Sequence, residues 1–196
     1  REFSDLVYQD PVYDVGGFTG GCRSGTPMSA SVNEETGQLR SLTYAGAEPT
    51  TLYFDDESNE INNEADEEND KFKVTSRQLK ESLQAIFPND WVAIQTSDSN
   101  NTKGVFRVYN SNNPGDYYYF DLLTGQVFML YQNSPWLDRD VLTKKQLVKY
   151  KARDGLTITG YLSLTKKKTD KNYFIILPHG GQNVKEGFGY DGWVQF

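Results

Sequence analysis

The residues best suited to chemistry lie near the end of the chain, where an apolar run meets a histidine and two glycines. Residues 173–178 carry no charge and are almost all aromatic or aliphatic, and His179, Gly180 and Gly181 follow directly. A short apolar run closed by glycine is typical of a strand buried on both faces of a parallel sheet. Paired glycines let the backbone turn sharply and approach another group. Because a His-Gly-Gly loop after an early strand can supply a backbone N–H to an oxyanion hole, this stretch is the first candidate site.

Other catalytic and metal-binding patterns are missing from the sequence. His179 is the only histidine and Cys22 the only cysteine, which excludes an internal disulfide and argues against a structural zinc site. No serine lies in a G-x-S-x-G arrangement, so the nucleophile elbow is absent. We therefore expect no metal ion and no cofactor. A single thiol leaves the compartment open between cytoplasm and periplasm.

The net charge of −7 comes from one acidic run, residues 55–70, which holds nine carboxylates and no Lys or Arg. Such a block cannot bury enough apolar surface to order itself, so we expect a solvated loop. A calcium site is the alternative, but the run has no glycine and lacks the D-x-D-x-D-G spacing. The negative net charge, together with the lack of a basic stripe in the sequence, argues against nucleic acid as a partner. No apolar run has the length of a membrane span.

The elements around these residues are expected to be mainly β. Tyr and Phe are frequent, at 13 and 11 residues, and both favour strands. Apolar runs between turn residues predict strands at 12–19, 27–32, 39–44, 91–96, 104–109, 117–122 and 126–131. The last four follow one another across short polar turns, as the strands of one propeller blade do. The earlier strands would form a second, irregular blade, and two blades cannot close a ring.

One helix interrupts the strands. Thr75 and Gln78 have capping-box spacing, and an apolar stripe of Leu79, Leu83, Ile86 and Phe87 follows until Pro88 ends the helix. We expect the apolar face of this helix to pack on a sheet.

The composition changes after residue 135. Residues 139–153 are basic, which we interpret as a solvated linker and strand edge rather than a site for nucleic acid or anionic lipid. Val148–Lys151 and Leu156–Leu164 then predict a hairpin, because Asp154 and Gly155 form a strong turn signal. The chain opens on Arg1 without a Met, which we expect of an internal segment.

Three C-terminal segments resemble the entry into the catalytic domain of prolyl oligopeptidase family serine peptidases, in the acylaminoacyl-peptidase and dipeptidyl-peptidase-like branch. These segments are Tyr150–Leu164, Leu177–Gly181 and Gly189–Phe196. The upstream segments that resemble the same branch are Asp14–Gly17, Ala85–Pro88, Tyr118–Gly125 and Pro135–Asp138. Gln182 departs from the pattern, since this branch usually has Pro there.

The resemblance implies a partial β-propeller of about two blades followed by the first strands of an α/β-hydrolase domain. The propeller part would span 1–135, with the acidic insertion 55–70 and the helix 75–87. A linker at 136–147 and the N-terminal part of the hydrolase domain at 148–196 would follow.

The resemblance also assigns roles to the loop. Gly181 would be the oxyanion donor through its backbone N–H, and Gly180 would allow the turn. His179 cannot be the triad base, because the triad order in α/β-hydrolases is Ser, acid, then His. It would be structural or lie next to substrate, and the whole triad would lie beyond Phe196.

Three hypotheses about function follow. The first is part of a serine peptidase that removes aminoacyl, acylaminoacyl or dipeptidyl groups by acyl-enzyme chemistry, with a peptide as substrate and with this chain inactive alone. The second is a non-enzymatic, β-rich fragment that binds a peptide or partner, or itself, through unpaired strands. The third is a fragment of an esterase or lipase, since such loops occur there too.

Overall fold

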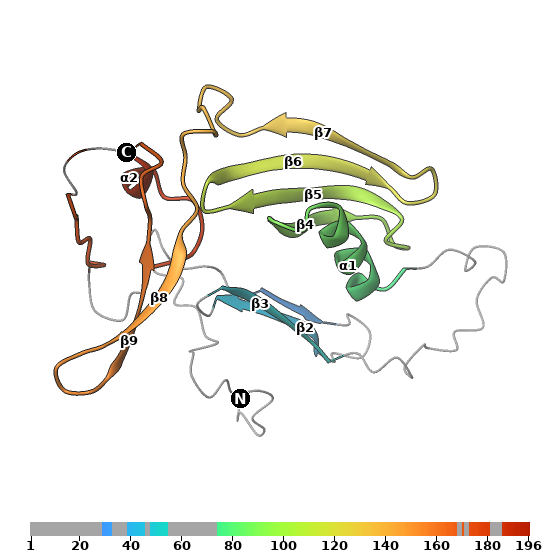
Figure 1. Cartoon of the computed structure of the whole chain (residues 1–196). Helices are drawn as coiled ribbons and strands as arrows, with labels where there is room; N and C mark the ends of the chain where they lie inside the picture. The colour runs from blue at the N-terminus through green and yellow to red at the C-terminus, as the bar shows by residue number, and fades with distance from the viewer. Residues whose placement is uncertain are drawn as a thin grey trace, which may run out of the picture. The chain divides into compact units, whose positions relative to one another are not determined.

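The chain is mainly β, with antiparallel sheets and little helix (Figure 1). The computed structural model describes residues 29–32, 39–45, 48–54, 74–167, 170, 173–180 and 186–196. It divides into two compact units, Arg1–Glu60 with Lys171–Phe188, and Ile61–Asp170 with Gly189–Phe196. The described strands form three separate sheets and no closed propeller. The domain boundaries at residues 135 and 148 stay predictions.

The described strands of the first unit form a three-stranded sheet in the order β1-β2-β3. Its strands are β1 (Ser29–Val32), β2 (Leu39–Ala45) and β3 (Pro49–Tyr53). Leu42 and Tyr44 are buried along β2. The predicted strand at 39–44 lies within β2, and residues 29–32 of the predicted strand at 27–32 form β1. Residues 27–28, the predicted strand at 12–19 and the acidic run 55–70 lie outside the described residues. Strand β3 was not predicted.

The second unit is built on a four-stranded antiparallel sheet in the order β4-β5-β6-β7. Its strands are β4 (Trp91–Ser97), β5 (Lys103–Asn110), β6 (Asn113–Asp121) and β7 (Gln126–Gln132). The prediction of four successive strands is confirmed. Its polar turns carry their own hydrogen bonds; for example, Asp98 Oδ1 accepts from the Thr102 amide at 2.6 Å, and Asp121 Oδ1 accepts from the Leu123 amide at 3.0 Å.

The start of β6 differs from the prediction, which began this strand at residue 117. The strand begins at Asn113, so that Pro114 and Gly115 lie within it and Asn110 pairs with Asn113. Two irregularities make this register possible. The pairing shifts between Val108 and Asn110, and Gly115 has φ +114°, which only glycine adopts without strain.

Helix α1 (Ser76–Ile86) packs on this sheet as expected. Its capping box is formed, since Thr75 Oγ1 accepts from the Gln78 amide at 3.2 Å and Gln78 Oε1 accepts from the Thr75 amide at 3.0 Å. Leu79 and Leu83 are completely buried. The helix ends before Pro88, as the sequence predicted.

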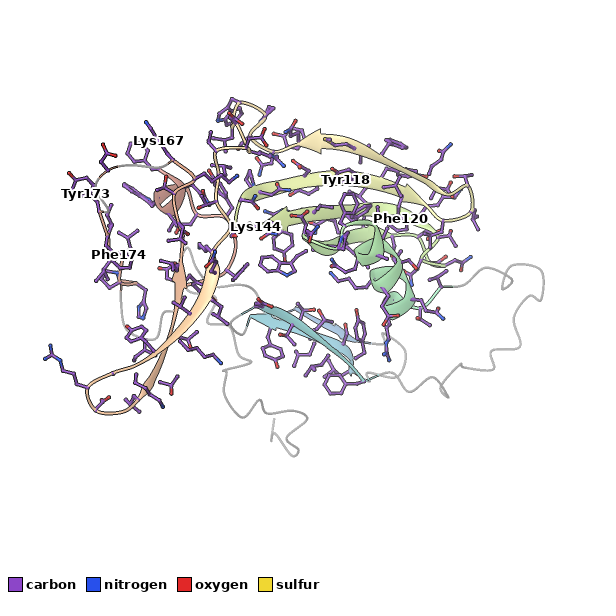
Figure 2. All side chains as sticks on the ribbon, viewed as in Figure 1. Tyr118, Phe120, Lys144, Lys167, Tyr173 and Phe174 are labelled. Atoms are coloured by element: carbon purple, nitrogen blue, oxygen red, sulfur yellow. The ribbon has the colours of Figure 1, made fainter. Side chains whose placement is uncertain are left out.

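The core of the second unit lies between α1 and one face of the sheet. Its buried members are Leu79, Leu83, Val92, Phe106, Val108 and Phe120. Tyr118 and Phe120 project from β6 on the side of α1 (Figure 2), and the Tyr118 ring stacks on that of Phe106 with centroids 5.4 Å apart. Each such buried side chain contributes about 1.5–3 kcal/mol, so the pairing of helix and sheet stabilises the unit.

The remaining elements are a two-stranded ribbon and a short helix. Strands β8 (Gln146–Lys151) and β9 (Thr157–Leu162) form the predicted hairpin, and Gly155 takes φ +87° at its turn. Helix α2 (Gly192–Gln195) was not predicted; the Asp191 carboxylate caps it by accepting from the Trp193 amide at 2.8 Å.

Candidate functional site

The stretch before the candidate loop does not form the predicted buried strand. Residues 173–180 have no regular secondary structure. The side chains of Tyr173, Phe174, Ile175, Ile176 and Leu177 are between 58% and 81% exposed; Figure 2 labels the first two. These residues do not form a strand because no described strand offers hydrogen-bond partners to their backbone. A strand buried on both faces needs a neighbour at each edge, and no described strand pairs with this segment.

The loop itself is only partly described. His179 is exposed, and a Cβ on Gly180 would meet no atom within 4 Å, so space remains for a close approach of another group. Gly181, the expected oxyanion donor, lies outside the described residues. Its role and that of His179 therefore stay predictions.

The described residues do not gather a metal-binding or catalytic cluster. No three His, Cys, Asp or Glu side chains among them are placed to hold an ion, and Cys22 lies outside the described part. No helix in that part is both long and apolar enough to cross a membrane.

A polar seam that the sequence did not predict joins the end of the four-stranded sheet to the later segments. We define the seam as Ser111, Asn113, Asp116, Asn133, Arg139, Thr143, Lys145 and Gln195. Its hydrogen bonds link residues that lie far apart in the sequence, across the part of the chain predicted to be a solvated linker.

Arg139 and Asp116 form the ionic half of the seam. Arg139 Nη2 donates to Asp116 Oδ1 at 2.7 Å, and Nη1 donates to Asp116 Oδ2 and, at 2.9 Å, to Asn113 Oδ1. The Asp116 side chain is 6% exposed and that of Arg139 is 24% exposed. The hydrogen bond to Asp116 is the main cause that raises the pKa of Arg139. The Arg139 guanidinium therefore stays charged, and the pair ties residues 133–139 to β6.

The other half of the seam is centred on the β5–β6 turn. Ser111 is fully buried, and its Oγ accepts from the Lys145 amide at 2.9 Å. Lys144 Nζ donates to the Asn89 carbonyl at 2.9 Å, and Lys145 is only 6% exposed. The interpretation of residues 139–153 as a solvated linker and strand edge is thus wrong for Lys145, which is buried and whose backbone amide is bonded to Ser111. Asp140 and Lys144 are exposed, as that interpretation expects.

The amino-acid sequence gives only a weak indication of this seam. Arg139 follows Pro135–Asp138, one of the segments in the family resemblance, but its partner Asp116 is an ordinary acidic residue in a strand. Bonds between side chains and distant backbone atoms follow no local spacing rule, so a sequence pattern cannot assign them.

Comparison with known proteins finds one partial likeness of this chain. It is similar to "Dipeptidyl aminopeptidase BIII" of Pseudoxanthomonas mexicana, with 26% identity over 138 residues, which cover 65% of this chain and 20% of the relative. The chain thus spans about a fifth of the length of that relative. No family model matches the chain, and no solved structure matches it. The chain is therefore a distant, partial relative of a peptidase.

Proposed function

We propose that this chain is part of a serine peptidase that removes short N-terminal groups, such as dipeptides, from peptides by acyl-enzyme chemistry. The observation that carries the proposal is the partial likeness to a dipeptidyl aminopeptidase. The resemblance of residues 150–164, 177–181 and 189–196 to the entry of a prolyl oligopeptidase family catalytic domain supports the same reading. The four-stranded sheet β4–β7 would then be one propeller blade.

In this proposal the chain contributes an oxyanion donor and no nucleophile. The Gly181 amide would stabilise the negative charge that develops on the scissile carbonyl oxygen, an effect worth about 3 kcal/mol for one donor. The serine, the acid and the histidine of the triad would come from the parent polypeptide beyond Phe196. The chain alone would therefore be inactive.

The test compares the purified 196-residue chain with the full product of its gene on a dipeptidyl chromogenic amide. The proposal expects hydrolysis by the full product, stopped by a serine-directed inhibitor, and none by the chain alone. Inhibitor-sensitive hydrolysis by the chain alone, or none by the full product, would overturn it.

The Gly181 role has its own test in the full product. Replacing Gly181 with Pro removes the N–H, so kcat should fall by about 10²–10³-fold, whereas Gly181→Ala keeps the donor as a matched control. An equal loss in both variants would show that the amide is not the donor.

A second candidate function is peptide or partner binding without catalysis. It is favoured by one observation, the exposure of five large apolar side chains in residues 173–177, since exposed apolar runs mark interaction sites. In the same assay this candidate predicts an inactive full product that still binds peptide.

A further inference from the structure

The side chain of Gln195 makes three hydrogen bonds to backbone atoms of two distant segments. Its Oε1 accepts from the Thr143 amide at 3.0 Å, and its Nε2 donates to the carbonyls of Thr143 at 2.7 Å and Ser111 at 2.9 Å. The acceptor and both donor hydrogens of the amide are thus used. Toward Thr143, the Gln195 side chain offers one donor and one acceptor. The backbone of a neighbouring strand would offer the same pair of groups.

The neighbouring hydrogen bonds show that this contact belongs to a larger network. Ser111, which receives the third bond, is fully buried and also accepts from the Lys145 amide through its Oγ. Its own amide donates to Asn110 Oδ1 at 2.7 Å. The β5–β6 turn, the approach to β8 and the last helix α2 therefore meet at one place, although they are 52 and 84 residues apart in sequence.

We propose that Gln195 is a latch that holds segment 189–196 and the start of the β8–β9 ribbon against the β5–β6 turn. Without its amide the Thr143 N–H would lose its acceptor, and the segment would lose its bond to Ser111. This inference concerns anchoring and stands whether or not the proposed peptidase function holds.

The first test uses the unmodified chain and compares two glutamine side chains by NMR. Gln95 is exposed, and within the described part of the chain its side chain makes one bond, to the Ala93 carbonyl at 3.2 Å, so it serves as an internal control. The side-chain amide hydrogens of Gln195 should exchange with water at least about tenfold more slowly than those of Gln95. Equal exchange rates would overturn the proposal without any mutation.

The second test follows the Thr143 backbone amide in three variants. Gln195→Ala should speed its exchange about tenfold or more, Gln195→Glu should have a smaller effect because an acceptor oxygen remains, and Gln95→Ala should have none. Amides in β5 report whether the sheet stays folded. Thr143 exchange that is unchanged in Gln195→Ala would contradict the latch; if Gln195→Ala opens the sheet as well, the first test decides.

Discussion

At the scale of single residues, Gly115 in β6 and Gly125 in the β6–β7 turn are required for different physical reasons. Gly115 has φ +114°, and a Cβ there would overlap the Arg107 guanidinium, which donates to the Pro114 carbonyl at 2.7 Å. Gly125 has φ +69°, but its Cβ would meet no atom within 4 Å. Backbone strain acts at both positions, and steric overlap acts at Gly115 alone.

Gly115→Ala should therefore lower the free energy of unfolding by about 2–4 kcal/mol, and Gly125→Ala by about 1 kcal/mol. Urea unfolding followed by fluorescence measures both. Equal losses in the two variants would contradict the prediction that Gly115 carries the larger cost.

Lys80 on α1 gives a pH-dependent prediction. Burial lowers the pKa of Lys80 from 10.5 to about 8, so between these values the unfolded chain holds a proton that the folded chain has released. Through this group, the free energy of unfolding should rise as pH increases from about 8 to 10.5. Lys80→Met should remove that rise and stabilise the chain at pH 7 by roughly 1–3 kcal/mol. Lys149→Met, at an exposed strand position, is the control; identical pH profiles for the two variants would refute the prediction.

At the scale of elements, α1 stabilises the second unit through one narrow face. Leu83 is fully buried against the sheet, whereas Ile86, on the same helix, is 50% exposed. Leu83→Ala should cost about 2–5 kcal/mol because it leaves a cavity, and Ile86→Ala should cost less than about 1 kcal/mol. Thermal unfolding of the two variants checks this, and a large loss at Ile86 would show that the packing differs.

Local patterns predicted the elements well where they depend on neighbours in sequence. The Thr75–Gln78 spacing predicted the start of the helix, and the polar turns predicted the four strands β4–β7. The prediction failed where the outcome depends on distant groups. Residues 173–177 have strand composition but no described pairing partner. The bonds of Gln195 and Arg139 join segments that no periodicity relates.

At the scale of the whole molecule, the likeness to a longer peptidase supports one proposal. The chain would carry blade-like sheets and the approach to a catalytic domain, and chemistry would require residues that it lacks. The candidate site was predictable only as a motif, because His179, Gly180 and Gly181 follow one another in sequence while their partners would come from elsewhere.

The measurement that tests this claim most directly is the sequence of the gene downstream of the codon for Phe196. The proposal predicts an open reading frame with a G-x-S-x-G motif, then an Asp and then a His, in that order. A stop codon directly after Phe196, or a continuing frame without that motif, would contradict it.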